Sequence, residues 1–287
     1  MSKAPVSRPS VFEHHDPVEF LQAWTRYLGE ESGLSLRALS TRAGLAAGFL
    51  PMVLARKRTL SVKAWLKLAP HLKLNKSERD YLSLLRDIAD SPTQEARLDA
   101  LAKLQRHPAY RRKNPREVEV HRYLTQWSIV AIRELANTKG FRGDPQWIVS
   151  RLRGRVSFEE VKRGLAFLKE AGYLAPGADG RLRATRKDLV CRDGVYKISL
   201  GEFHRQTLAL AIDSIANVPA DRRSIEAHTL PIRSADLDRV RAILNEALDK
   251  IAALEPPAES GDSVYHVSMA AFPLTKQDAD TKGDTSS

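Results

Sequence analysis

Nine basic side chains lie between Gly33 and Ser77, and no carboxylate lies among them. A merely solvated surface usually mixes charges of both signs, whereas guanidinium and ammonium groups gathered without acids favour contact with phosphates. We therefore expect this stretch to form an electrostatic footprint for a polyanion, with double-stranded DNA as the expected partner. The candidate phosphate contacts are Arg37, Arg42, Arg56, Lys57, Arg58 and Lys63.

The charge balance of the whole chain supports this location. The 287 residues carry a net charge of +11, and residues 1–116 hold almost all of the excess. A basic balance of this kind favours polyanionic partners. The length is sufficient for two or three domains, and neither a signal-peptide core nor a bilayer-length apolar run is present, so we expect a cytoplasmic protein.

Catalytic chemistry finds little support in the sequence. Gly177 and Gly180 lack the Lys and Ser/Thr that follow in a phosphate-binding loop, and no Ser, His, Asp arrangement stands out. The histidines are scattered, and His204 and His228 are expected to be structural. Cys191 is the single cysteine, so it is interpreted as a packed residue. We expect no enzyme, no cofactor and no metal site.

The elements that position the basic stretch are short helices. Apolar spacing predicts a helix from Pro17 to Leu28, and Ser35 and Gly44 are a suitable N-cap and left-handed C-cap for a helix from Leu36 to Ala43. A second helix within residues 46–55 completes a helix-turn-helix outline. Two further helices follow, the first over residues 61–71 and the second begun by residues 75–78. The first is expected to turn these side chains inward: Val62, Trp65, Leu66 and Ala69.

The second helix of this motif has an unusual sequence, AAGFLPMVLA. Ala46 and Ala47 offer no capping oxygen, and only the weak thioether of Met52 can accept a hydrogen bond. Pro51 costs about 3 kcal/mol in a helix interior but little in the first turn, so the helix is expected to start late. Direct reading of bases needs stronger polar groups, which leaves phosphate contact as the expected role of the head.

A polar stretch, residues 91–117, is interpreted as a linker, and residues 118–187 as a winged-helix-like domain. Three helices are expected over residues 123–136, 144–152 and 157–171, with Asp144 and Ser157 as N-caps, followed by a hairpin with its turn at residues 177–180. The helix from Ser157 would read bases while the hairpin contacts phosphates, unless this part is only a packing module. The candidate DNA contacts here are Lys162, Arg163, Arg181, Arg183, Arg186 and Lys187.

Residues 188–275 carry a net charge of −4 and are not expected to bind DNA. Helices are expected over residues 200–217 and 234–254, with an extended stretch at residues 224–232 and a strand from Val264 to Phe272. So small a sheet is best completed by a second copy of the chain, so we expect an α+β dimerisation domain, with ligand sensing as the alternative. Residues 1–16 and 276–287 are expected to be disordered.

Several motifs resemble a known bacterial family, in which a lambda-repressor-like (Xre-type) helix-turn-helix head precedes a domain of unknown function that ends in FPLT. The similarity covers residues 17–275 and includes LSLRALSTRAGL, KRTLS, WSIVAIREL, DPQWIVSRL, LAFLKEAGYL, FHRQTLALA, RRSIEAHTLPI and VYHVSMAAFPLT. The resemblance implies an Xre-like head at residues 17–90 and a role in transcription regulation. It supplies neither a ligand nor a target sequence.

The expected fold is mainly α with small β elements: an N-terminal helix-turn-helix bundle, a middle winged helix and a C-terminal α+β domain. The expected function is a DNA-binding transcriptional regulator that acts as a homodimer. The alternative is a protein interaction module whose helix-turn-helix no longer reads DNA, because AAGFLPMVLA exposes apolar groups.

Overall fold

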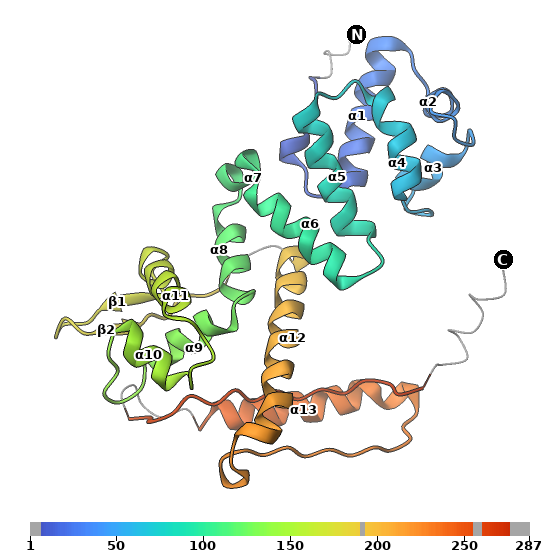
Figure 1. Ribbon diagram of the computed structural model, residues 1–287. Helices are drawn as coiled ribbons and strands as arrows, with labels where there is room; N and C mark the ends of the chain where they lie inside the picture. The colour runs from blue at the N-terminus through green and yellow to red at the C-terminus, as the bar shows by residue number, and fades with distance from the viewer. Residues whose placement is uncertain (1–6, 190–192, 255–259, 276–287) are drawn as a thin grey trace. The chain divides into compact units, whose positions relative to one another are not determined.

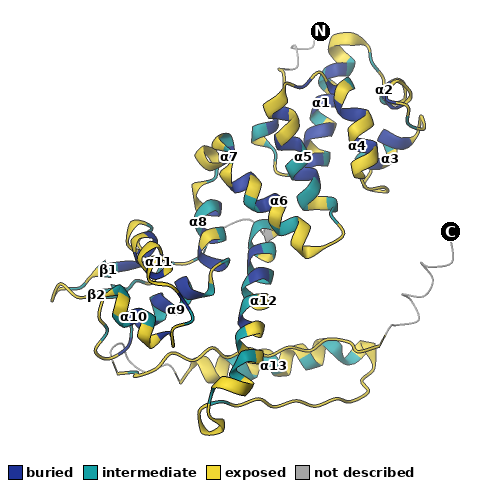
Figure 2. Cartoon of the chain, in the orientation of Figure 1, coloured by how far each residue is buried: buried dark blue, intermediate teal, exposed yellow. Residues whose placement is uncertain are grey.

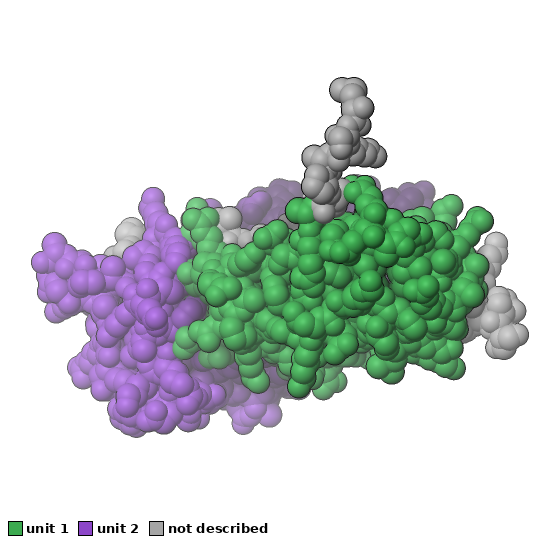
Figure 3. All heavy atoms as spheres, turned by 90° about the horizontal axis from the view of Figure 1, so that it is seen from above, with its two compact units in different colours: residues 1–126, 188–205 green, residues 127–187, 206–287 purple. Residues whose placement is uncertain are grey.

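The computed structural model describes residues 7–189, 193–254 and 260–275 (Figure 1). The described chain is mainly helical, and its only sheet is a two-stranded antiparallel hairpin, which confirms the expected fold class. The chain divides into two compact units, which Figure 3 colours separately. Unit 1 comprises residues 1–126 and 188–205, and unit 2 comprises residues 127–187 and 206–287.

The head of unit 1 contains the expected helices, and local capping explains where most of them begin. The elements are η1 (Val11–Glu13), α1 (Pro17–Ser32), α2 (Leu36–Arg42), α3 (Phe49–Leu54), α4 (Val62–Leu68), η2 (Ala69–Leu72) and α5 (Lys76–Asp90). Asp16 accepts hydrogen bonds from the first turn of α1, and Ser35 and Ser61 do the same for α2 and α4. Asn75 and Glu78 form a capping box on α5.

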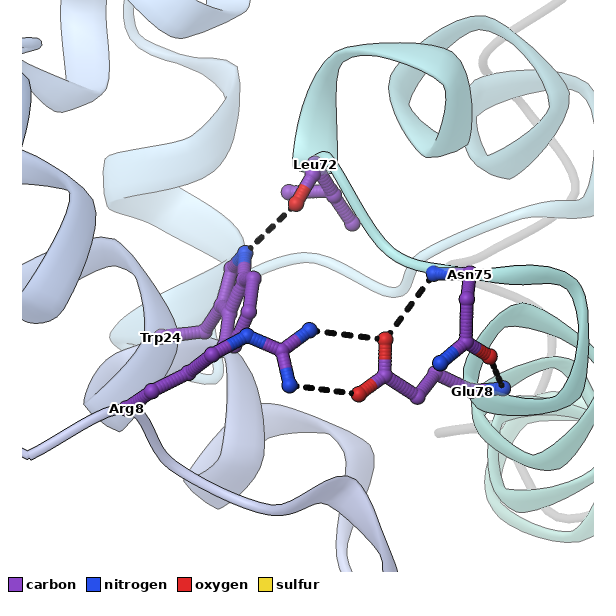
Figure 4. Close-up of polar contacts among 5 residues, drawn as sticks. All are labelled: Arg8, Trp24, Leu72, Asn75 and Glu78. Atoms are coloured by element: carbon purple, nitrogen blue, oxygen red, sulfur yellow. Dashed lines mark hydrogen bonds and ion pairs between the residues drawn. The ribbon is translucent and has the colours of Figure 1, made fainter.

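The head surrounds one apolar core to which η1 also contributes. Trp24 is 1% exposed, and its indole nitrogen donates a hydrogen bond of 2.8 Å to the carbonyl of Leu72 (Figure 4). Val11 is equally buried, and Arg8 forms an ion pair of 2.8 Å with Glu78. The expectation of disorder over residues 1–16 is therefore wrong from Arg8 onward, because Val11 and Arg8 find partners in the core and on α5. Residues 1–6 lie outside the described residues.

Helix α4 corrects one expectation about the core. Trp65 is buried as expected, but Val62 and Leu66 are 59% and 67% exposed. Ala64 and Leu68 are buried with Trp65 instead. The apolar residues of this helix cover a wider face than the one that is buried. The apolar periodicity alone therefore predicted burial for residues at the exposed edge of that face.

The stretch expected as a linker is helical. Residues 91–117 hold α6 (Gln94–Arg106), α7 (Pro108–Lys113) and the start of α8 (Pro115–Leu124). Thr93 caps α6, and Pro108 and Pro115 each stand in a first turn, where the missing N–H has no helical partner to lose. Leu104 and Tyr110 join the core of the head. The two prolines thus begin helices here and do not mark an irregular connection.

Unit 2 contains the expected helices and hairpin of the middle domain. These are α9 (Trp127–Leu135), α10 (Pro145–Arg151), α11 (Phe158–Glu170), β1 (Leu174–Pro176) and β2 (Leu182–Ala184). Leu174 pairs with Ala184 and Pro176 with Leu182. Asp144 and Ser157 cap α10 and α11 as expected. The helix expected over residues 123–136 is interrupted, because α8 ends at Leu124 and α9 begins at Trp127.

The last part of the chain holds α12 (Asp193–Asn217), η3 (Ala220–Arg222), η4 (Ser234–Asp236) and α13 (Leu237–Ala252). The strand expected from Val264 to Phe272 is not formed, because no described segment pairs with it. The β pairing in the described residues after 188 is limited to an isolated bridge between Gly261 and Thr138. The expected α+β domain is therefore helical with extended segments. Cys191 and residues 276–287 lie outside the described residues. No helix in the described chain is both long and apolar enough to span a membrane.

Candidate nucleic-acid interface

Helices α2 and α3 follow each other closely, and a left-handed glycine fixes the turn between them. Gly44 has a φ of +65°, which costs a residue without Cβ very little. Its N–H donates to the carbonyl of Thr41 at 2.9 Å, and the N–H of Leu45 donates to the carbonyl of Ser40 at 3.0 Å. These two bonds form a Schellman motif that ends α2 and directs the chain toward α3.

Ser40 provides the cap that α3 lacks in its own sequence. The residue is fully buried, and its hydroxyl oxygen accepts a hydrogen bond of 3.2 Å from the N–H of Leu50. The same hydroxyl donates to the carbonyl of Leu36, one turn earlier in α2. A side chain of the first helix thus satisfies an N–H in the first turn of the second helix, which locks the two together.

The exposed surface of α3 carries no strong hydrogen-bonding side chain. Phe49, Leu50 and Val53 are buried, and Pro51 stands in the first turn, as expected for a helix that starts late. Met52 is 43% exposed, and Ala55 at the C-cap is exposed. An adenine or guanine edge needs an amide or guanidinium partner, so α3 itself offers only apolar contact to bases.

Arg56 ends α3 and is not a free cation. It occupies the left-handed C′ position with a φ of 56°, and the N–H of Lys57 closes the motif on the carbonyl of Met52. Its guanidinium lies 3.0 Å from Asp16 and 4.0 Å from Glu19, at the start of α1. Acids from outside the carboxylate-free stretch thus fold back onto Arg56 and compete with its predicted phosphate contact.

The other candidate cations of the head differ in how they are held. Arg58 lies over the ring of Phe49, with 5.0 Å between the guanidinium carbon and the ring centroid. Lys67, outside the candidate set, donates to the carbonyl of Gly44 at 3.3 Å. Four candidates are exposed and form no ion pair within the described residues: Arg37, Arg42, Lys57 and Lys63. They come from α2, the end of α3 and the start of α4.

A shallow hollow lies beside this group. Arg56, Lys57 and Arg58 line it together with Val18, Val53, Thr59, Leu60 and Asp90. Asp90 accepts a hydrogen bond of 3.0 Å from the N–H of Leu60, which fixes the α3–α4 connection to the end of α5. This connection is thus held in one conformation while Lys57 stays exposed.

In the middle domain, α11 presents Lys162 and Arg163 on its exposed face. Glu160 is occupied by the capping box: it accepts hydrogen bonds from the N–H and the hydroxyl of Ser157. Those hydrogen bonds, with Arg163 nearby, hold the pKa of Glu160 below its usual range. Glu160, an acid next to the candidate cations on α11, therefore has a local structural role.

The hairpin uses several of its cations for its own stability. Arg183 forms an ion pair of 3.0 Å with Asp179, and Arg181 lies 4.0 Å from the same carboxylate. Lys187 donates to the carbonyl of Ala171, which ends α11, and its ammonium lies 4.6 Å from the centroid of the Tyr173 ring. Arg183 thus stabilises the hairpin and Lys187 joins it to the end of α11, and these contacts compete with their predicted phosphate contacts. Arg186 is exposed.

A second group of exposed cations was overlooked in the sequence because its segment was interpreted as a linker. Arg106 ends α6, Arg111 and Arg112 lie on α7, and Arg116 lies at the start of α8. The signal was the basic cluster RHPAYRRKNPRE itself. Its neighbour Lys113 forms an ion pair of 3.1 Å with Glu13.

Comparison with protein families gives one match. Residues 108–274 match the family described as "Domain of unknown function (DUF4423)". The chain belongs to this family. The comparisons with curated proteins and with solved structures found no match. The DUF4423 region begins at Pro108, the first residue of α7, so it starts within the segment expected as a linker and leaves the helix-turn-helix outside it.

The DUF4423 region contains two buried polar pairs that lie within unit 1. The hydroxyl of Tyr110 donates to Glu117, and burial raises the pKa of that carboxyl above its usual range. The Nδ1 atom of His121 lies 3.1 Å from the hydroxyl of Ser199 on α12, and burial lowers the pKa of His121 to about 4. Both shifts follow from desolvation, so these pairs are interpreted as structural contacts. Within the described residues, no group of His, Cys, Asp and Glu is arranged to hold a metal ion.

Proposed function

We propose that this protein is a cytoplasmic DNA-binding transcriptional regulator whose helix-turn-helix head contacts the phosphate backbone. One observation carries the proposal: Arg37, Arg42, Lys57 and Lys63 are exposed around α2 and α3, with no ion pair to the described chain. Cations so placed displace counterions from a duplex and position the protein on it without reading its sequence.

Sequence reading is assigned to α11 of the middle domain. Lys162 and Arg163 lie on its exposed face, and a helix followed by a hairpin is the arrangement that places a recognition helix in the major groove. Arg186 and Arg181 would then contact phosphates beside it. This division of roles follows from the surface of α3, which offers no strong donor or acceptor for base edges.

The test is fluorescence anisotropy with the duplex upstream of the protein's own gene, beside a random duplex of equal length. We expect tighter binding to the upstream duplex, and we expect Lys162→Ala with Arg163→Ala to remove that preference while binding to random duplex persists. Replacement of Lys139 and Lys169 by alanine, which removes two other exposed lysines of unit 2, is the matched control. Equal affinity of the unmodified protein for both duplexes contradicts a sequence-specific regulator.

A second candidate function, a protein interaction module, is favoured by the exposed apolar side chains of the head. Met52, Val62 and Leu66 expose apolar surface on α3 and α4, at 43%, 59% and 67%. Exposed apolar groups next to lysines suit a protein partner better than a duplex. If the head binds neither duplex at low salt, this interaction module becomes the preferred interpretation.

A further inference from the structure

Residues 206–254 and 260–275 leave an unusual amount of apolar surface uncovered. Of the nineteen large hydrophobic side chains that are exposed in the described chain, fifteen lie in this segment. Figure 2 shows α13 and the extended segments around it mostly as exposed or intermediate. A concentration of exposed apolar groups on this scale marks an interaction surface, because monomeric proteins rarely leave such patches open.

Helix α13 contributes part of this uncovered apolar surface. None of its residues is buried, and Ile243 is 58% exposed. Its apolar stripe also includes Leu237, Val240, Leu244 and Leu248, which are only half-buried. An amphipathic helix of this length owes most of its stability to burial of such a stripe. The stripe of α13 therefore requires a partner beyond what the described chain supplies.

Two extended segments in the same unit have unpaired backbone. No backbone hydrogen bond joins residues 224–232 or residues 267–275 to any described part of the chain. The second segment contains Val267, Met269 and Phe272, with Phe272 72% exposed. Extended backbone with apolar side chains and free N–H and C=O groups is a template for strand pairing.

The charges of the segment argue against a polyanionic partner. Residues 206–275 carry a net charge of −4, which disfavours nucleic acid and anionic lipid. Several charges of α13 are already paired along the helix, as between Arg241 and Asp238 and between Lys250 and Glu246. The groups that remain for a partner are apolar side chains and unpaired backbone edges. Both suit a second copy, because two identical strands that pair antiparallel about a two-fold axis hydrogen-bond through the same backbone edge in each copy.

We propose that residues 206–254 and 260–275 form a homodimer interface in which the α13 stripes and the extended segments of two copies cover each other. A stable interface buries about 800 Å² and 20–30 residues of each partner. The fifteen exposed large hydrophobic side chains would supply its apolar part. The proposal is independent of DNA binding by the head, since the two rest on different surfaces.

The test is sedimentation velocity of the full chain over roughly the micromolar range, combined with hydrogen exchange of residues 267–275. We expect a dimer, and slow exchange in this segment that becomes fast on dilution. Ile243→Asp should raise the dimer dissociation constant by about 100-fold or more, because it places a charge in the interface. The matched control is Leu66→Asp in the head, which is 67% exposed and should leave the dimer intact.

Circular dichroism of each variant reports whether α13 still folds. If Ile243→Asp loses helix, Val267→Lys on the extended segment replaces it, with the same expected loss of dimer. A monomer throughout the concentration range overturns the proposal, as does a dimer that tolerates the unit 2 substitutions or that Leu66→Asp dissociates. A monomer that binds phosphatidylcholine vesicles assigns the surface to lipid and overturns it as well.

Discussion

The head at residues 7–90 and the segment at residues 206–275 both contain amphipathic helices, yet they differ in what those helices cover. In the head, Phe20, Leu21 and Trp24 are at most 1% exposed, and several exposed cations form no ion pair to the described chain. In the second segment α13 has no buried residue, and the free groups are apolar side chains and backbone. The contrast shows that one region covers its apolar groups with its own helices, whereas the other leaves its apolar groups exposed within the described chain.

The largest expected effect on stability comes from truncating Trp24 in the core of the head. Trp24→Ala should lower the free energy of unfolding of unit 1 by about 3–5 kcal/mol, because it leaves a cavity and removes the hydrogen bond to Leu72. Urea unfolding followed by circular dichroism measures the loss. The comparison is Ile243→Ala at a concentration where the chain is monomeric, for which we expect about 0.5 kcal/mol or less. Similar losses at both positions would remove the distinction between the two regions.

Acidification should destabilise unit 1 through His121. Its pKa is about 4 in the fold, whereas the unfolded chain takes up this proton near pH 6.5. Stability from this group is therefore full above about pH 6.5 and falls as the pH drops toward 4, by about 3 kcal/mol in all.

The measurement for His121 is urea unfolding at about pH 7 and about pH 4.5, for the unmodified protein and for His121→Asn. The variant should lose less stability between the two pH values, whatever its absolute stability. His71→Asn, which replaces another histidine of unit 1, serves as the control and should keep the full dependence. An unchanged pH dependence in His121→Asn would show that this site does not govern the acid response.

Ser40→Ala should lower the free energy of unfolding by about 1 kcal/mol, because the N–H of Leu50 loses its capping oxygen. The control is Thr41→Ala, since the Thr41 hydroxyl bonds to Arg37 within α2 and does not contact α3. We expect Ser40→Ala also to weaken duplex binding more than Thr41→Ala does. Equal effects of the two variants would mean that Ser40 does not hold α3 in place.

The smallest effect is expected for Arg56→Gly. The change removes a partly exposed ion pair with Asp16 and also relieves a left-handed backbone, so the two contributions nearly cancel and stability should change by about 0.5 kcal/mol or less. Duplex affinity should be almost unaffected, because the guanidinium is already paired. A clear loss of affinity would show that Arg56 contacts the duplex despite its ion pair.

The sequence was sufficient wherever a structure is decided locally. Ser35, Asn75, Asp144 and Ser157 could be assigned as caps because each stands just before an apolar-periodic run, and Gly44 because only glycine adopts its conformation cheaply. Pro108 and Pro115 were misread, since a proline that begins a helix and one that breaks it look alike without the neighbouring packing.

Long-range contacts explain the remaining differences. No residue near Arg56 in the sequence indicates an ion pair with Asp16, and none near Leu50 indicates that Ser40 accepts its N–H hydrogen bond. The outward position of Val62 and Leu66 depends on which neighbours α4 meets, which periodicity does not specify. The strand expected at residues 264–272 requires a partner strand, and the described chain does not supply one.

The most direct test of the central claim is the salt dependence of duplex binding by the full chain. We expect log K to fall linearly with log salt concentration. Lys57→Ala with Lys63→Ala should flatten the slope by about 1.8, at about 0.9 for each lost phosphate contact. Arg239→Ala with Lys250→Ala on α13, a control that removes the same charge, should leave the slope unchanged. An unchanged slope in the Lys57 and Lys63 variant, or equal flattening by both variants, would contradict the claim that the head binds phosphates.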